Sequence, residues 1–321
     1  MHLYKEIDIL KGIAIILVVL GHIEVLYALD VYTQLRNFIY TFHMPLFMSI
    51  SGYLYGKHHN SSFSYLSFVK KKAKRLLLPY ISIMGIYYII KYLSEVTIGV
   101  NTPIGITSLL YTLFINPYGG FVSFLWYVYV LFLIYLIVPF FKKLPLLVVI
   151  SFVIYFIPFP SLFCLNMLSK HMLFFVLGLL LYKYLSQGKN LDVRYLFVPS
   201  LALQILLYIY IEQLPNIAFD FILALLGIVT AYSLSKLITD YKLPLLRYIG
   251  EYSSEIYFLH IIFILGVVTF SKMLPITFNW MSYVQLILQL IAGLTGPLFF
   301  AILLKKLKMK KLYQILFGKS I

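Results

Sequence analysis

Two ionisable side chains lie eleven residues apart in the first long apolar run of the chain, Lys11 and His22 of IDILKGIAIILVVLGHI. On an α-helix this spacing is about three turns, so both side chains project from one face and differ in height by about 16 Å. Each ionisable group at bilayer depth costs about 2 to 3.5 kcal/mol, so such a face is expected to line a polar cavity. Because histidine exchanges protons near neutral pH, the pair predicts general acid–base chemistry inside a membrane.

Further polar side chains are expected at two depths of the same helical bundle. With the N-terminus in the cytoplasm, those expected near His22, in the outer half, are His43, Arg36, Trp126, His171, Asp220 and Lys91. Those expected near the inner surface are Asp8, Lys11, Glu255 and His260. Asp8 and Lys11 are three residues apart and can pair along a helix. Structural roles stay open: neutralised charges for Asp8 and Glu255, and hydrogen bonds between packed helices for the histidines.

The composition is that of a polytopic membrane protein. The 321 residues are 62% hydrophobic and 12% charged, with a mean hydropathy of +0.94, whereas soluble domains are about 25% charged. No stretch is long and polar enough for a soluble domain, so residues 1–321 are expected to form one membrane domain. The net charge is +15, and the basic residues that cause it lie between the apolar runs. Membrane topology and anionic lipids explain basic residues at these places, so they do not indicate a nucleic-acid partner. Cys164 is the single cysteine and no metal-ligand motif is present, so we expect neither a disulfide nor a metal site.

Runs of about 20 apolar residues predict an all-α fold with ten membrane-spanning helices. These helices cover 7–28, 37–56, 76–97, 121–141, 144–163, 169–186, 193–212, 217–239, 253–274 and 282–304. Most of the 26 Lys and Arg residues then share one side with both termini, and the positive-inside rule assigns that side to the cytoplasm. Residues 305–321 are expected to form a basic cytoplasmic tail. The long outer connection over 98–120 is expected to contain an interfacial or re-entrant helix over a cavity.

The basic cluster KKKAKR, residues 70–75, has two interpretations. As a topology signal and a contact for anionic lipid headgroups it needs no further explanation. Alternatively, cations at the inner mouth of a polar cavity attract a phosphorylated cytosolic ligand, such as the nucleotide end of coenzyme A. Arg75 is a candidate donor-binding residue under the second interpretation.

Several segments resemble, in order and spacing, those of the integral-membrane acyltransferase 3 family. IDILKGIAIILVVLGH resembles the family's first helix, in which Arg or Lys is followed by ten residues and a histidine. FHMPLFMSISGYLYG (42–56) is similar to the second-helix motif of the fucose 4-O-acetylase-like branch. Later matching segments are KKKAKRLLLPY, FLWYVYVLFLIY, FFVLGLLLYK and YIGEYSSEIYFLH.

The resemblance implies transfer of an acyl group, usually acetyl, from cytosolic acyl-coenzyme A to a hydroxyl of a cell-surface or lipid-linked glycan. It implies that the positions of His22 and Lys11 are essential, that acetyl-CoA is a co-substrate with no bound cofactor, and that the protein lies in the plasma membrane. It also implies the stand-alone type of the family, without a fused esterase-like domain.

These observations lead to a hypothesis for the roles of the side chains. His22 is the general base for the acceptor hydroxyl, and a relay through an acyl-histidine stays open. Lys11, oriented by Asp8, stabilises the donor's charge, and Arg36, His43 and Trp126 hold the acceptor or polarise the carbonyl. The other donor-side or supporting candidates are Arg75, Glu255 and His260. The alternative is a transporter or flippase of a glycolipid or polysaccharide, for which intramembrane charges are equally natural.

Overall fold

The computed structural model describes residues 2–25, 29–58, 64–99, 103–189, 191–211, 216–239, 241, 243–273 and 281–320. Regular structure within these ranges is helical throughout, which confirms the all-α fold. Six described segments are long and apolar enough to cross a membrane: Tyr65–Ile98, Ser123–Phe140, Leu162–Ser186, Ile217–Thr239, Ser253–Lys272 and Met281–Lys306. The protein is therefore a multi-pass membrane protein. The chain divides into two compact units, Met1–Leu54 with Leu181–Leu303 and Tyr55–Leu180 with Leu304–Ile321.

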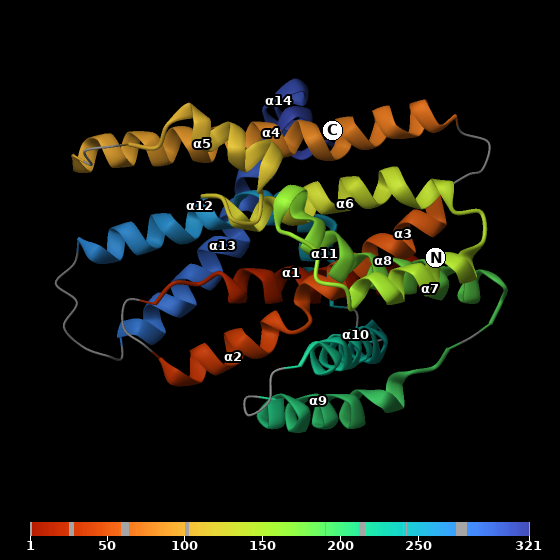
Figure 1. The fold of residues 1–321 in the computed structure, drawn as a ribbon. Coiled ribbons are helices and arrows are strands. Elements are labelled where there is room, and N and C mark those ends of the chain that lie inside the picture. Colours follow the sequence, from red (N-terminus) through yellow and green to blue (C-terminus); the bar gives the residue numbers. More distant parts are fainter. Residues whose placement is uncertain are drawn as a thin grey trace. The chain divides into compact units, whose positions relative to one another are not determined.

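The first unit is organised around its N-terminal helix, α1 (His2–Gly21). The helices that pack most extensively on α1 are α2 (Asp30–Tyr40), α10 (Ile217–Thr239), α11 (Pro244–Glu251) and α12 (Ser253–Lys272). Beside α10 lies α9 (Phe197–Ile211), which follows a 3₁₀ turn over Arg194–Leu196 (Figure 1). The remaining helices with residues in this unit are α3 (His43–His58), α13 (Met281–Lys306) and, at its end, α8 (Leu165–Ser186). A central α1 means that its polar side chains are positioned by several neighbours at once.

Glycines allow α1 and α11 to approach until their main chains touch. A Cβ atom on Gly250 of α11 would overlap the main-chain oxygen of Asp8, and one on Gly12 would overlap that of Leu246. The sequence did not predict α11 as a separate helix, although Pro244 at its first position is a common start signal. The contact sets where α12, which follows α11 directly, begins alongside α1.

The second unit is built on α4 (Tyr65–Ile98) and on α6 (Trp126–Ile137), which packs against it. The chain between these helices contains α5 (Ile106–Leu110), a π-helical turn over Tyr111–Ile115 and a 3₁₀ turn over Ser123–Leu125. After α6 come a 3₁₀ turn over Val138–Phe140, then α7 (Leu144–Tyr155), a 3₁₀ turn over Leu162–Cys164 and α8 (Leu165–Ser186). The expected tail contains a further helix, α14 (Lys310–Phe317), which packs on α4 (Figure 1).

Prolines explain two of the differences between predicted and observed helices. The expected helix over 37–56 is divided into α2 and α3, with the break at residues 41 and 42. Pro45 lacks an N–H group and clashes with the preceding turn inside a helix, but it is tolerated in the first turn, where α3 places it. The expected helix over 144–163 ends at Tyr155, shortly before Pro158 and Pro160.

Other boundaries differ without a proline. The first helix ends at Gly21, not at residue 28, and residues 26–28 lie outside the described residues. Helix α4 begins at Tyr65, eleven residues before the predicted start, so the basic cluster 70–75 is helical. Lys and Arg are good helix formers with long apolar stems, which allows this extension. The predicted helix over 217–239 matches α10.

Candidate functional site

The end of α1 carries His22, the first residue after the helix. Its Nδ1–H donates to the main-chain oxygen of Val18 at 2.8 Å. A carbonyl only accepts hydrogen bonds, so this bond requires the proton on Nδ1 and places the lone pair of the ring on Nε2. The partial negative charge at the C-terminus of α1 stabilises the imidazolium that forms when Nε2 accepts a proton. The local geometry therefore suits a general base.

Two tyrosines of α2 hold the main chain on both sides of His22. The Tyr32 hydroxyl is shared between the carbonyl oxygens of Leu20 (2.9 Å) and Ile23 (2.7 Å). The Tyr40 hydroxyl donates to the carbonyl oxygen of Gly21 (2.6 Å). The last carbonyls of a helix have no partner within the helix, so these bonds satisfy them and fix the exit of the chain. Sequence reasoning missed both tyrosines, and the available signal was their spacing of two turns on one helix face.

Gln289 of α13 holds the next part of the chain. Its side-chain Oε1 accepts from the main-chain N–H of Glu24 at 2.9 Å, and its Nε2 donates to the main-chain oxygen of the same residue. The Gln289 side chain is fully buried. Both main-chain groups of Glu24 are thus satisfied by one amide, two residues beyond His22. Sequence reasoning missed Gln289, although an amide within an apolar span is costly without such partners.

Replacing Gln289 with leucine should lower both stability and turnover, because the two main-chain groups of Glu24 lose their partners. We expect a loss of about 1 to 3 kcal/mol in the free energy of unfolding. The kcat for acyl transfer should fall and the KM for the acyl donor should stay constant, since His22 is displaced and donor contacts are untouched. Thermal unfolding and steady-state kinetics measure both effects.

The matched control for Gln289→Leu is Thr295→Ala on the same helix. Thr295 is exposed and its hydroxyl donates only to the oxygen of Ile291, within α13. This variant should retain wild-type stability and kcat. A Gln289→Leu enzyme that behaves like Thr295→Ala would show that the amide does not position the chain at His22.

Four rings form a continuous row that includes His22. The ring centroids are 5.0 Å apart for His260 and His22, 6.4 Å for His22 and Tyr40, and 5.0 Å for Tyr40 and His43. His43 and His260 are both buried. Nδ1 of His43 donates to the main-chain oxygen of Ile39 at 2.9 Å, and Nδ1 of His260 donates to that of Tyr257 at 2.7 Å. The structure thus brings His43 to the site of His22, through Tyr40.

His260 lies at the level of His22, whereas the sequence placed it near the inner surface with Asp8 and Lys11. The reason is the start of α12. Because α11 packs on α1 at Gly12, α12 starts alongside α1 and reaches His22 within two turns. Glu255, five residues before His260, is buried near the start of α12 and accepts a hydrogen bond from the Ser254 hydroxyl at 2.8 Å.

Arg36 lies on α2 midway between Tyr32 and Tyr40. Its guanidinium carbon is 6.0 Å from the centroid of the Tyr32 ring, so α2 brings a positive charge to the residues that hold the end of α1. Arg36 lies on α2 and His43 begins α3, on either side of the break at residues 41 and 42. Tyr40, one turn beyond Arg36, contacts both His43 and His22.

Asp8 and Lys11 form the ion pair that their spacing predicted. The Lys11 Nζ atom is 2.7 Å from Asp8 Oδ1, and both side chains are about one-fifth exposed. Eleven residues separate Lys11 from His22, which corresponds to about 16 Å along a helix. The first unit therefore carries a charged pair and an imidazole at two separate heights of α1.

Asp220 lies in the first turn of α10, in the first unit, and the remaining candidates belong to the second unit. Trp126 and His171 contact each other, with ring centroids 4.7 Å apart. Lys91 pairs with Glu95 at 2.7 Å. Gly318, which follows α14, packs on Arg75 so closely that an added Cβ atom would overlap the main-chain oxygen of Arg75. A shared site of these residues with His22 stays a prediction.

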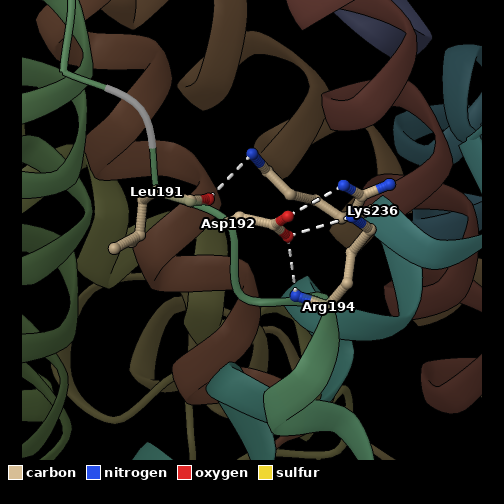
Figure 2. A network of polar contacts seen from close by, with 4 residues as sticks. All are labelled: Leu191, Asp192, Arg194 and Lys236. Carbon is tan, nitrogen blue, oxygen red and sulfur yellow. Dashed lines mark hydrogen bonds and ion pairs between the residues drawn. The ribbon is translucent and has the colours of Figure 1, made fainter.

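Figure 2 shows a polar network that fixes the chain before α9. The Asp192 carboxylate accepts from Arg194 Nε at 2.9 Å and from Nη2 at 2.8 Å, and Lys236 Nζ of α10 donates to the oxygen of Leu191 at 3.0 Å. The hydrogen bonds from the Arg194 side chain are the largest cause that lowers the pKa of Asp192, to about 2. Lys236 thus anchors this connection to α10, and the Arg194–Asp192 pair fixes its local conformation.

This network predicts a pH-dependent term in stability. Because the pKa of Asp192 falls from 3.8 to about 2 on folding, the ion pair stabilises the fold above pH 3.8 and its contribution disappears as the pH falls towards 2. Asp192→Asn should therefore unfold at a slightly lower temperature than wild type at pH 6, and most of this difference should be lost at pH 2. A difference that persists unchanged at pH 2 would contradict the assignment. The effect is small because the pair is about half exposed.

Comparison with known proteins gives one family and one partial match. A model of the acyltransferase 3 family, described as an acyltransferase domain, matches residues 4–306. The nodulation protein NolL of Sinorhizobium fredii is 56% identical over 55 residues, which cover 15% of this chain and 14% of that protein. No solved structure matches the chain. Within the described ranges, no three His, Cys, Asp or Glu side chains are grouped to hold a metal ion.

Proposed function

The chain belongs to the acyltransferase 3 family, and from this premise we propose that it is a plasma-membrane O-acyltransferase with cytoplasmic termini that moves an acetyl group from acetyl-CoA to a hydroxyl of a cell-surface or lipid-linked glycan. The observation that carries the proposal is the placement of His22. Its Nδ1–H is held by the Val18 carbonyl, its main chain is held by three side chains, and its ring lies in a row with two further imidazoles. A preorganised base of this kind is what attack by a sugar hydroxyl requires.

The proposed reaction is a direct transfer with His22 as base and then acid. Nε2 removes the proton of the acceptor hydroxyl as its oxygen attacks the thioester carbonyl carbon, which forms a tetrahedral intermediate. When the intermediate collapses, the carbon–sulfur bond breaks and the thiolate of coenzyme A takes the proton from the imidazolium. The products are the glycan ester and free coenzyme A, and His22 returns to its starting tautomer.

Charges in the first unit support the other steps of the proposal. Arg36 places a guanidinium beside the tyrosines that hold the end of α1, where it can stabilise the oxyanion of the intermediate. Lys11, oriented by Asp8, offers a cation about 16 Å from His22 along α1, a separation that an extended pantetheine chain can bridge. One extended donor molecule can therefore place its phosphate groups at Lys11 and its reacting carbonyl at His22. The second-unit candidates Arg75 and Trp126 are proposed to contact donor and acceptor.

The proposed function is tested by acyl transfer in membranes that contain or lack the protein. Vesicles are supplied with acetyl-CoA labelled in the acetyl group and with the surface polysaccharide of cells that lack the protein. Label should move to the polysaccharide as a base-labile ester only when the protein is present. A transporter or flippase would leave all label on coenzyme A while it changes the side of the membrane on which the glycan is found, and that result would reject the proposal.

A further inference from the structure

The connection between α4 and α6 carries an open cavity in the second unit. Its volume is about 530 Å³, within the range of about 300 to 1,000 Å³ typical of small-molecule sites. The lining residues are Ile104, Thr107, Ser108, Tyr111, Thr112, Gly119, Gly120 and Phe121. All of them lie within 18 residues of one another in the sequence, so one segment forms the whole wall.

This segment runs back along α4 after the helix ends. Near its start, the main-chain N–H of Ile104 donates to Glu95 Oε2 at 2.7 Å, and further on, the oxygen of Leu113 accepts from the Tyr80 hydroxyl at 2.9 Å. Glu95 and Tyr80 are separated by about 22 Å along α4. The connection therefore descends beside the helix as a re-entrant segment, and the cavity lies on it.

One end of the cavity is far from the basic cluster on the same helix. Tyr88 of α4 contacts the lining residue Phe121, with ring centroids 6.2 Å apart, and donates to the oxygen of Ile104. Tyr88 is 13 to 18 residues beyond the cluster at 70–75, a rise of about 20 to 27 Å, and the hydrocarbon core of a bilayer is about 30 Å thick. This end of the cavity thus lies towards the membrane surface opposite the cations, and the lining residue Thr112, whose main-chain oxygen is 3.4 Å from the Tyr80 hydroxyl, lies deeper.

The chemistry of the wall selects a neutral ligand rich in hydroxyl groups. None of the eight lining residues is charged. Thr107 and Ser108 are exposed, and their hydroxyls make no hydrogen bond within the described residues, so they are available to a ligand. The Tyr111 ring is 51% exposed and offers a face on which the C–H groups of a sugar ring can stack. No cation lines the cavity, and Lys91, near Ile104, is paired with Glu95.

Local backbone features also mark the segment. The π-helical turn at Tyr111–Ile115 is a rare conformation that is frequently found at functional sites. Gly120 lies against the Thr112 side chain so closely that a Cβ would overlap it. The glycine therefore lets the end of the segment pack against its middle.

We propose that this cavity binds a neutral sugar unit of the acceptor glycan and delivers the glycan from the membrane surface opposite the basic cluster. The identification of the ligand as the acceptor rests on the proposed function. The sugar's hydroxyl groups bond to Thr107 and Ser108, and its apolar face packs on Tyr111. Specificity for the acceptor then depends on the second unit, whereas the proposed base belongs to the first.

The test compares variants that fill or strip the cavity. Ser108→Trp fills it and Tyr111→Ala removes its aromatic wall. The control is Phe114→Ala, in the same π-helical turn, because Phe114 is 54% exposed and does not line the cavity. Full-length protein in lipid nanodiscs is titrated with fluorescently labelled surface polysaccharide from cells that lack the protein, without acetyl-CoA. The same samples are then assayed for transfer, and thermal unfolding confirms that each variant is folded.

We expect both cavity variants to weaken polysaccharide binding about tenfold or more, and to raise the KM for polysaccharide by the same factor. The KM for acetyl-CoA and the rate of acetyl-CoA hydrolysis without acceptor should stay at wild-type values, as should all constants of Phe114→Ala. Unchanged binding and KM in both cavity variants would overturn the proposal. So would a wild-type protein that ignores the polysaccharide but binds a fluorescent fatty acid at the cavity. Cavity-dependent binding without any acetyl transfer would leave this site standing and reject the proposed reaction.

Discussion

Replacing His22 with alanine should lower the rate of acyl transfer about a thousandfold, within the range of about 10² to 10⁴ for loss of a general acid–base group. A factor of this size corresponds to about 4 kcal/mol in the activation free energy. Without the imidazole, the acceptor hydroxyl has no base to take its proton and the departing thiolate has no acid. The measurement is transfer of labelled acetyl from acetyl-CoA to surface polysaccharide in nanodiscs, at saturating concentrations of both substrates.

An asparagine at position 22 separates the loss of the base from damage to the fold. The amide nitrogen of His22→Asn can replace Nδ1 as donor to the Val18 carbonyl, but the side chain cannot take up a proton at neutral pH. This variant should unfold at the temperature of the wild type and be as inactive as His22→Ala. The second control is His58→Ala, at the exposed end of α3, which should retain full activity.

Wild-type transfer by His22→Asn would exclude both base catalysis and a relay through an acyl-histidine, because neither can proceed on an amide. Full activity restored by added imidazole in His22→Ala would instead support the role of the base. A scaffold without turnover predicts that His22→Ala changes only the unfolding temperature.

Local signals in the sequence were sufficient for the helices and for the charges within them. The apolar runs predicted α10 residue for residue, and the i to i+3 spacing predicted the ion pair of Asp8 and Lys11. The ion pair depends on neighbours within one turn, and helix α10 depends on burial of apolar residues in a bilayer. Both kinds of signal can be read directly from a single sequence. Pro45 also carried a signal for the break before α3, but hydropathy outweighed it because the residues on both sides are apolar.

Features that depend on contacts between distant segments could not be read in the same way. The two bonds from Gln289 to Glu24 join residues 265 positions apart, and nothing in either local sequence specifies the partner. The sequence placed His260 at the wrong depth. Its height was counted from the start of its helix, which was assumed to lie at the inner membrane surface. The actual reference is the contact of α11 with α1 at Gly12 and Gly250, which only the three-dimensional arrangement reveals.

The same contact gives the second large expected effect, which concerns Gly250. Gly250→Ala should destabilise the protein by about 3 kcal/mol, because its Cβ meets main-chain atoms of Asp8 that cannot move aside as a side chain can. At an unconstrained helical position the same exchange is favourable by about 0.5 to 1 kcal/mol. The matched control is Gly266→Ala in α12, where the added Cβ has no neighbour within 4 Å.

Thermal unfolding in identical nanodiscs should therefore shift in opposite directions for the two variants, with Gly250→Ala lower and Gly266→Ala equal to or higher than wild type. Acetyl transfer by the folded fraction of Gly250→Ala should also fall. Displacing α11 from α1 moves the start of α12, and with it the ring of His260 that lies against His22. If the two alanine variants unfolded at the same temperature, α1 and α11 would not be in main-chain contact, and the level assigned to His260 beside the proposed base would be wrong.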